Sequence, residues 1–274
     1  MIRSLYRFAG PLSGLSLLFM ILLAGCAEES TTEPSSEPEP VVEEPIIEYP
    51  QKLKTLSSYV NTFIGTGGHG HTFPGATMPF GMAQISPDTR LEGWDGCSGY
   101  HNTDSVVYGF SHTHLSGTGV SDYGDLLLMP MLGPATFESG YGKSPDEGYA
   151  SRFSKRRERG WPGYYGVMLL DDNISVELAA TERGGLHKYG FDRNGQAFVV
   201  MDLAHRDPVI ESSFKVVGDS RVEGMRRSNA WATDQHFYFS LEFSQPIIST
   251  QMQGENKDEK SASGKKVKAI FEFD

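Results

Sequence analysis

Glycine-rich segments early in the chain bring together aromatic, acidic and basic residues that could contact a sugar. Gly93–His101 holds Trp94, Asp95 and His101, and Arg90 lies just before it. Sugars bind through C–H faces that pack on aromatic rings and through hydroxyls that hydrogen-bond polar side chains. The indole of Trp94 suits the first task, and the three polar side chains suit the second. The cluster therefore predicts carbohydrate contact, and the alternative is an aromatic residue that fills a corner of the core.

Two histidine pairs are each spaced two residues apart, His69 with His71 and His112 with His114. In an extended strand such residues point to the same side, so each pair could bind a metal through imidazole nitrogens. The alternative is that they hydrogen-bond the backbone or line a polar pocket. No HExxH motif, cysteine cluster or dense acidic loop accompanies them, so we expect this chain alone to hold no metal.

Other catalytic centres lack their usual sequence context. The glycines of residues 65–70 are not followed by the Gly-Lys-Ser/Thr ending or the helix of a phosphate cradle. No sequence neighbour activates Cys97 as a nucleophile, which favours a buried or pocket-lining thiol. Asp122 and Asp125 could form a carboxylate pair, but acids three apart in a glycine-rich loop are also common at surfaces.

The chain is acidic, which argues against a nucleic-acid partner. Its 274 residues include 24 Lys and Arg against 35 Asp and Glu, for a net charge of −11. A nucleic-acid surface needs a basic face to neutralise phosphates. Hydrophobic residues make up 38% of the chain, enough to build a core.

The first 50 residues have the composition of a secretory targeting signal followed by a spacer. Residues 1–26 join a basic start, an apolar run too short to span a bilayer, and Leu23-Ala24-Gly25-Cys26, which resembles a bacterial lipobox. We expect a lipoprotein signal peptide, lipidation at Cys26 and anchoring to the bacterial cell envelope, at the outer membrane. Residues 27–50 carry eight Glu and five Pro, which predicts a disordered linker.

Residues 51–274 have the pattern of an all-β fold, a large antiparallel β-sandwich. Short runs rich in β-branched and aromatic residues alternate with turn residues, and no run keeps a helical period. Residues 171–173 and Asn194-Gly195 each predict a hairpin turn, and 251–266 has the composition of a polar loop. The expected strands are Tyr164–Leu170, Ile174–Thr181, Leu186–Phe191, Gln196–Leu203, Gln235–Phe243 and Val267–Phe273.

The last expected strand stops one residue before the C-terminus. We expect such a domain to continue into a further part. We also expect an exposed apolar face, near the loops of residues 59–125 or near the last strands, where that part would pack.

From about residue 59 onward, the order of motifs resembles the start of glycoside hydrolase family 92, whose members are exo-acting α-mannosidases. The matching motifs are Phe63–Gly68, Thr72–Ala76, Pro79–Met82, Trp94–His101, Phe110–Gly117, Val176–Arg183, Gly185–Tyr189 and Gly224–Trp231.

The resemblance implies an N-terminal β-sandwich followed by an (α/α)₆ barrel, and inverting hydrolysis assisted by calcium. An inverting enzyme holds its acid and base about 6.5–9.5 Å apart. In the family these carboxylates and the calcium ligands belong largely to the barrel, so we assign no catalytic residue and no cofactor to this chain. A separately encoded (α/α)₆ domain is one possible partner.

The resemblance also implies that loops of the sandwich contact a mannose-containing glycan. Trp94 is expected to form an aromatic wall, with Arg90, Asp95 and Cys97 as neighbours of the sugar. The residues expected to line the inter-domain cleft or brace its loops are His69, Thr72, Phe73, His112 and His114. The alternative function is a lone lipid-tethered carbohydrate-binding module without catalysis.

Overall fold

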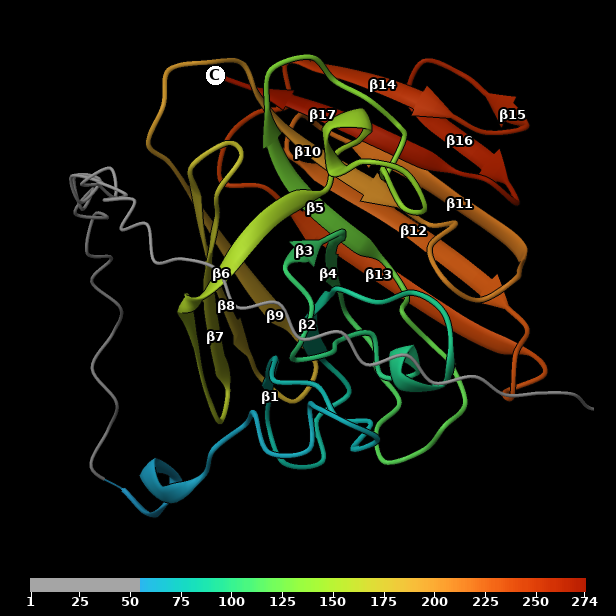
Figure 1. Cartoon of the computed structure of the whole chain (residues 1–274). Coiled ribbons are helices and arrows are strands. Elements are labelled where there is room, and N and C mark those ends of the chain that lie inside the picture. The colour runs from blue at the N-terminus through green and yellow to red at the C-terminus, as the bar shows by residue number, and fades with distance from the viewer. Residues whose placement is uncertain (1–54) are drawn as a thin grey trace, which may run out of the picture. The chain divides into compact units, whose positions relative to one another are not determined.

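The computed structural model describes residues 55–274 (Figure 1). The predictions for the signal peptide, Cys26 and the linker of residues 27–50 lie outside the described residues. Within residues 55–274 no helix is long and apolar enough to cross a bilayer. The helical turns of this part are 3₁₀ turns at Leu56–Tyr59 (η1), Trp94–Gly96 (η2) and Pro145–Glu147 (η3).

The predicted all-β antiparallel fold is confirmed, and its strands form three sheets. The seven-stranded sheet contains, in spatial order, β1 (Ala76–Thr77), β2 (Gln84–Asp88), β4 (Gly109–Ser111), β5 (Leu127–Leu132), β10 (Ala197–Asp202), β17 (Lys268–Phe273) and β14 (Ser249–Gln253). One five-stranded sheet contains β13 (Gln235–Glu242), β12 (Arg221–Ser228), β11 (Val209–Val217), β16 (Ser261–Gly264) and β15 (Asn256–Lys257). The other contains β3 (Val106–Val107), β6 (Ser151–Trp161), β7 (Tyr164–Leu169), β8 (Ile174–Ala180) and β9 (Gly185–Phe191).

The seven-stranded sheet is buried on both faces at its centre. Phe198 and Val200 of β10 join a core with the β7–β8 side, while Val199 and Met201 join a second core with β11 and β12. Successive side chains of a strand point to opposite faces, so a strand between two cores must be apolar at nearly every position. This explains the unbroken apolar run of β5, whose residues 127–131 are all buried.

One predicted hairpin is confirmed and the other is wrong. β7 and β8 pair in register around residues 171–173, where Asn173 has a φ of 55°. β9 pairs with β8, whereas β10 lies between β5 and β17, so Asn194-Gly195 connects two different sheets. A two-residue turn signal does not reveal that the strand after it is apolar on both faces and joins another sheet.

The predicted polar loop at 251–266 is also wrong. It holds the end of β14 and both β15 and β16. β15 pairs only two residues with β16 and is exposed, and β14 lies at the edge of its sheet. Edge strands can remain polar because they contribute little to a core, so composition does not distinguish them from a loop.

Exposed apolar residues gather near the start of the described chain. Leu56, Tyr59, Ile64, Phe80 and Met82 are each at least 71% exposed. The last strand differs, because β17 is paired on both sides and Ile270 and Phe271 are buried. Of the two places expected for an exposed apolar face, the N-terminal loops therefore carry exposed apolar side chains.

Candidate functional site

Two loops come together at the segment predicted to contact sugar, one before β1 and one between β2 and β3. The first closes on itself at Gly70, where a Cβ would lie 2.0 Å from the carbonyl oxygen of Gly65. The ring of His101 lies 3.1 Å from the Gly68 carbonyl, and the Asn102 amide donates to Thr66. These bonds hold the glycine-rich turn against the loop that carries η2.

Trp94 opens η2 and is 61% exposed. Gly93 before it has a φ of 81°, a conformation that glycine adopts without strain. A Cβ on Gly119 would lie 2.1 Å from Cζ3 of Trp94, so the loop between β4 and β5, which contains Gly119, lies directly against the indole. The edge of the His71 ring meets the indole with centroids 5.0 Å apart. The indole is therefore supported by two loops and still open to solvent.

Asp95 lies between two histidines of the first loop. Its Oδ1 is 2.6 Å from Nδ1 of His69 and 3.4 Å from Nε2 of His71. The hydrogen bond with His69 is the main reason that the pKa of this carboxyl lies below its usual range. The two histidines were expected to point to one side. Both lie close to the Asp95 carboxylate, but His69 is exposed and His71 is buried. The sequence-based site included His69 and left out His71.

Arg90 is half-buried and paired with Asp104. Its guanidinium also donates to Oγ1 of Thr103 at 3.2 Å. Cys97, by contrast, is 1% exposed, and its Sγ lies 2.5 Å from the Thr118 carbonyl. Burial raises the pKa of this thiol, which suits an unreactive packing residue that fixes the 118–119 turn.

The remaining predicted residues support the loops. Oγ1 of Thr72 donates to the Ile64 carbonyl at 3.0 Å, and the Phe73 ring packs on His114 with centroids 4.8 Å apart. His114 is buried and bonds the Ser98 carbonyl and Ser111, whereas His112 bonds the Leu126 carbonyl and His187. The second histidine pair therefore does not converge on a common point, contrary to the expectation from its spacing.

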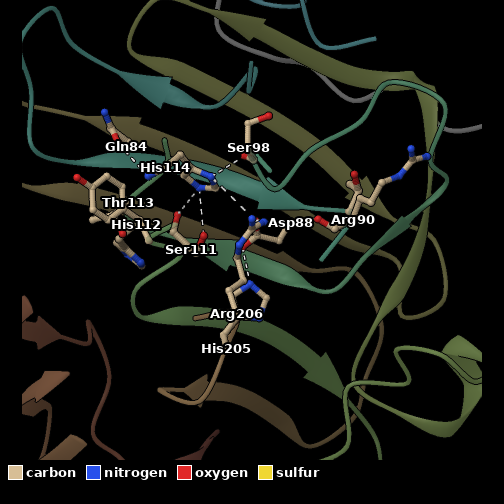
Figure 2. Close-up of polar contacts among 12 residues, drawn as sticks. Gln84, Asp88, Arg90, Ser98, Ser111, His112, Thr113, His114, His205 and Arg206 are labelled. Carbon is tan, nitrogen blue, oxygen red and sulfur yellow. Dashed lines mark hydrogen bonds and ion pairs between the residues drawn. The ribbon is translucent and has the colours of Figure 1, made fainter. Parts of the chain in front are cut away.

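A buried charged cluster behind the loops was not predicted from the sequence (Figure 2). Asp88, at the end of β2, lies 2.8 Å from His205 and 3.6 Å from Arg206. Burial acts to raise the pKa of this carboxyl, but His205, His114 and Arg206 outweigh it and lower the pKa to about 2. Arg206 also donates to the carbonyls of Gly96 and Cys97, at 3.1 and 2.9 Å. The sequence feature that could have revealed this cluster is the polar run His205-Arg206-Asp207, which follows shortly after the apolar β10.

Asp122 and Asp125 are both buried, so the surface alternative for these acids is wrong. Asp125 pairs with the fully buried Arg226 of β12. Asp122 accepts from the amide of Ala232 at 2.9 Å and is hydrogen-bonded to Asp207. Each acid has its own partner, and the two do not act as a pair.

Within residues 55–274, one group of three possible metal ligands comes together, namely His69, His71 and Asp95. Calcium takes six to eight oxygen ligands. Two imidazoles and one carboxylate do not fit that ion, so this group is not the calcium site that the family resemblance implies.

The fold and these loops define an antiparallel β-sandwich domain with an exposed aromatic and polar loop cluster. Residues 59–274 match the sequence profile described as "Glycosyl hydrolase family 92 N-terminal domain". The chain belongs to glycosyl hydrolase family 92 and carries its N-terminal domain, which confirms the resemblance inferred from the motifs.

Solved structures and a curated protein agree with this family. The family GH92 α-mannosidase BT3965 of Bacteroides thetaiotaomicron, solved with mannoimidazole, matches 80% of this chain at 34% identity with a TM-score of 0.76. The inverting mannosidase BT2199 of the same organism matches 82% at 26% identity with a TM-score of 0.68. An "Uncharacterized secreted glycosidase" of Arthroderma benhamiae is 33% identical over 137 residues, or 50% of this chain.

This chain corresponds to only a part of each relative. The matched region is 30% of BT3965, 30% of BT2199 and 17% of the Arthroderma protein. The family membership therefore concerns one domain of larger glycosidases.

Proposed function

We propose that this chain supplies the sugar-contacting loops of an exo-acting α-mannosidase that acts on mannose-containing glycans. The supporting observation is the exposed indole of Trp94 beside Asp95 and His69, in a domain whose relatives include two mannosidases. In this proposal the indole packs on the apolar face of a terminal mannose, and Asp95 and His69 hydrogen-bond its hydroxyls.

The proton donor and acceptor come from an (α/α)₆ barrel in the same or a separate polypeptide. The complete enzyme inverts the anomeric centre, and calcium bound outside residues 55–274 supports substrate distortion. The one group of three His, Cys, Asp or Glu ligands among residues 55–274 does not fit calcium, and no step of this proposal is assigned to a metal in this domain.

The test uses this chain alone with methyl α-mannoside as the probe. We expect weak, millimolar binding by NMR titration and no release of the aryl group from an aryl α-mannoside. Trp94→Ala should weaken binding about five- to tenfold, because stacking on an aromatic face contributes about 1 kcal/mol. The control is Tyr238→Ala, which removes another aromatic residue that is 70% exposed.

The outcomes separate the alternatives. Turnover by the chain alone would overturn the placement of the catalytic groups. Micromolar binding would favour the lone carbohydrate-binding module instead. An absence of mannoside-dependent shifts at high millimolar ligand would contradict sugar contact by this domain.

Gly119→Ala should weaken mannoside binding as much as Trp94→Ala does. The added methyl group would meet the indole at 2.1 Å, so the ring must leave its position while the tryptophan remains in the chain. The matched control is Gly67→Ala, whose Cβ would meet only Cβ of Asn102 at 3.6 Å. Unchanged binding in Gly119→Ala would show that the position of the indole does not matter for the sugar.

Anchoring to the bacterial outer membrane through lipidated Cys26 is the second part of this proposal. Its support is the lipobox-like sequence that ends at Cys26. Cys26→Ala should move the protein from the membrane fraction to the soluble fraction, because two lipid chains are needed for stable attachment and the variant would carry none. Fractionation followed by immunoblotting measures this, and an unchanged membrane fraction would contradict the proposal.

A further inference from the structure

We propose that His69, His71 and Asp95 form a binding site for a divalent transition metal, with zinc as the best fit. Each residue offers one ligand atom, and the three atoms all lie within 4.8 Å of one another. Two imidazoles and one carboxylate are a common donor set for zinc and other transition metals. The spacing of the histidine pair allows metal binding, although the sequence context led to the expectation of no metal.

The buried histidine of the group points to a missing ligand. The His71 side chain is only 6% exposed, and its buried Nε2 has no hydrogen-bond partner. It lies 3.4 Å from the Asp95 carboxylate, without the geometry of a hydrogen bond. A buried polar atom without a partner costs free energy, so a bound cation at this nitrogen would stabilise the arrangement.

The backbone holds His71 in this position. Its φ is 54°, in the left-handed region that a residue other than glycine rarely adopts. The carbonyl of His71 accepts from the Gly117 amide at 2.6 Å, and its ring meets the edge of Trp94. Such strain persists only where the surroundings enforce it, and it is common at ligand sites.

Two of the three donor atoms, on His71 and Asp95, are already spaced for a tetrahedral ion, and the third, on His69, must move to reach that spacing. Ligand atoms about 2.0–2.1 Å from a tetrahedral centre are about 3.3 Å apart. The 3.4 Å separation of His71 and Asp95 already fits. His69 is 2.6 Å from Asp95, but its side chain is 78% exposed and can move outward when the metal replaces the shared proton. Water or another oxygen ligand would take the fourth coordination position.

The experiment titrates Zn²⁺ into the purified, tag-free chain in a Cys26→Ser background, because tags and free thiols also bind zinc. The other cysteine, Cys97, is buried. We expect about one zinc per chain by calorimetry and a rise in Tm with zinc concentration. Co²⁺ in place of zinc should give the intense visible absorption of tetrahedral coordination. No glycan is present, so the result does not depend on the proposed function.

Two variants at side chains outside the core, the exposed His69 and the half-buried Asp95, test the ligands. His69→Gln and Asp95→Asn should each weaken zinc binding at least about tenfold, as the loss of a ligand weakens a metal site more than the loss of a supporting group. The matched control is His236→Gln, which removes a histidine that lies 3.1 Å from Asp234 in another exposed pair. No zinc binding at 100-fold excess over protein, or zinc binding in both ligand variants as tight as in the unmodified protein, would overturn the site.

Discussion

Asp125→Ala should lower the free energy of unfolding by about 3–5 kcal/mol. Asp125 and Arg226 are both fully buried and form an ion pair between the loop before β5 and β12. Arg226 also donates to the carbonyls of Leu203, His205 and Asp207, at 3.0, 2.8 and 2.9 Å. Removing the carboxylate leaves a buried guanidinium without its counter-charge, and this loss exceeds that of an ordinary hydrogen bond. Equilibrium denaturation in urea measures the effect.

Three further variants make this result interpretable. Asp125→Asn keeps the shape and removes only the charge, so it should fold and lose an intermediate amount of stability. Asp125→Leu combined with Arg226→Met should recover part of the loss, because apolar residues of similar volume need no counter-charge. Asp234→Ala, in the exposed pair with Arg227, should hardly move the midpoint. Equal losses for the buried and the exposed pair would contradict the argument.

The sequence predicts the strands of this fold better than their assembly. β7, β8, β10, β13 and β17 were expected within about one residue at most ends, because each has a run of apolar or alternating residues. Local pattern does not encode which sheet a strand joins. The pairing of β10 with β9 was therefore predicted wrongly. The apolar residues of β10 pack in two cores at once, and a turn sequence carries no information about that.

In the candidate site, too, local features were predicted from the sequence and long-range contacts were not. The sequence predicted that Trp94 contacts sugar, with a place in the core as the alternative, and its 61% exposure contradicts the core alternative. His69 and His71 have the same side chain but opposite burial, because a left-handed φ at His71 turns its ring inward. The contact of Asp88 with His205 joins residues 117 positions apart. Contacts of that length depend on sheet topology, so the buried cluster could not be foreseen from the motifs.

A second large effect concerns Asp207, whose replacement by Asn should stabilise the protein more at pH 8 than at pH 5. Burial and a hydrogen bond with Asp122 raise the pKa of the Asp207 carboxyl from 3.8 to about 7, against the opposing charge of Arg226. The folded protein therefore holds a proton that the unfolded chain releases near pH 4. Its contribution to stability is complete below about pH 4 and is lost as the pH rises through about 7.

Buried histidines act in the opposite direction over part of this range. Burial lowers the pKa of His112 to about 4 and that of His187 well below 6.5, so both favour the folded state more as the pH rises from about 4 to 6.5. The pH profile of the unmodified protein combines these contributions. The difference between Asp207→Asn and the unmodified protein isolates the carboxyl, because the histidines are the same in both.

That difference should grow by about 2–3 kcal/mol between pH 5 and pH 8, because it rises by about 1.4 kcal/mol per pH unit between the unfolded pKa of 3.8 and the folded pKa of about 7. Above pH 7 the unmodified protein holds an ionised, buried Asp207 carboxylate against Asp122, whereas the side-chain amide that Asp207→Asn introduces can still donate to Asp122 and accept from the Tyr123 amide. Urea denaturation at several pH values measures the difference. The control is Asp192→Asn at an exposed turn, whose profile should run parallel to that of the unmodified protein. A difference that is constant with pH would show that Asp207 is ionised throughout, and that Arg226 dominates over burial in setting its charge.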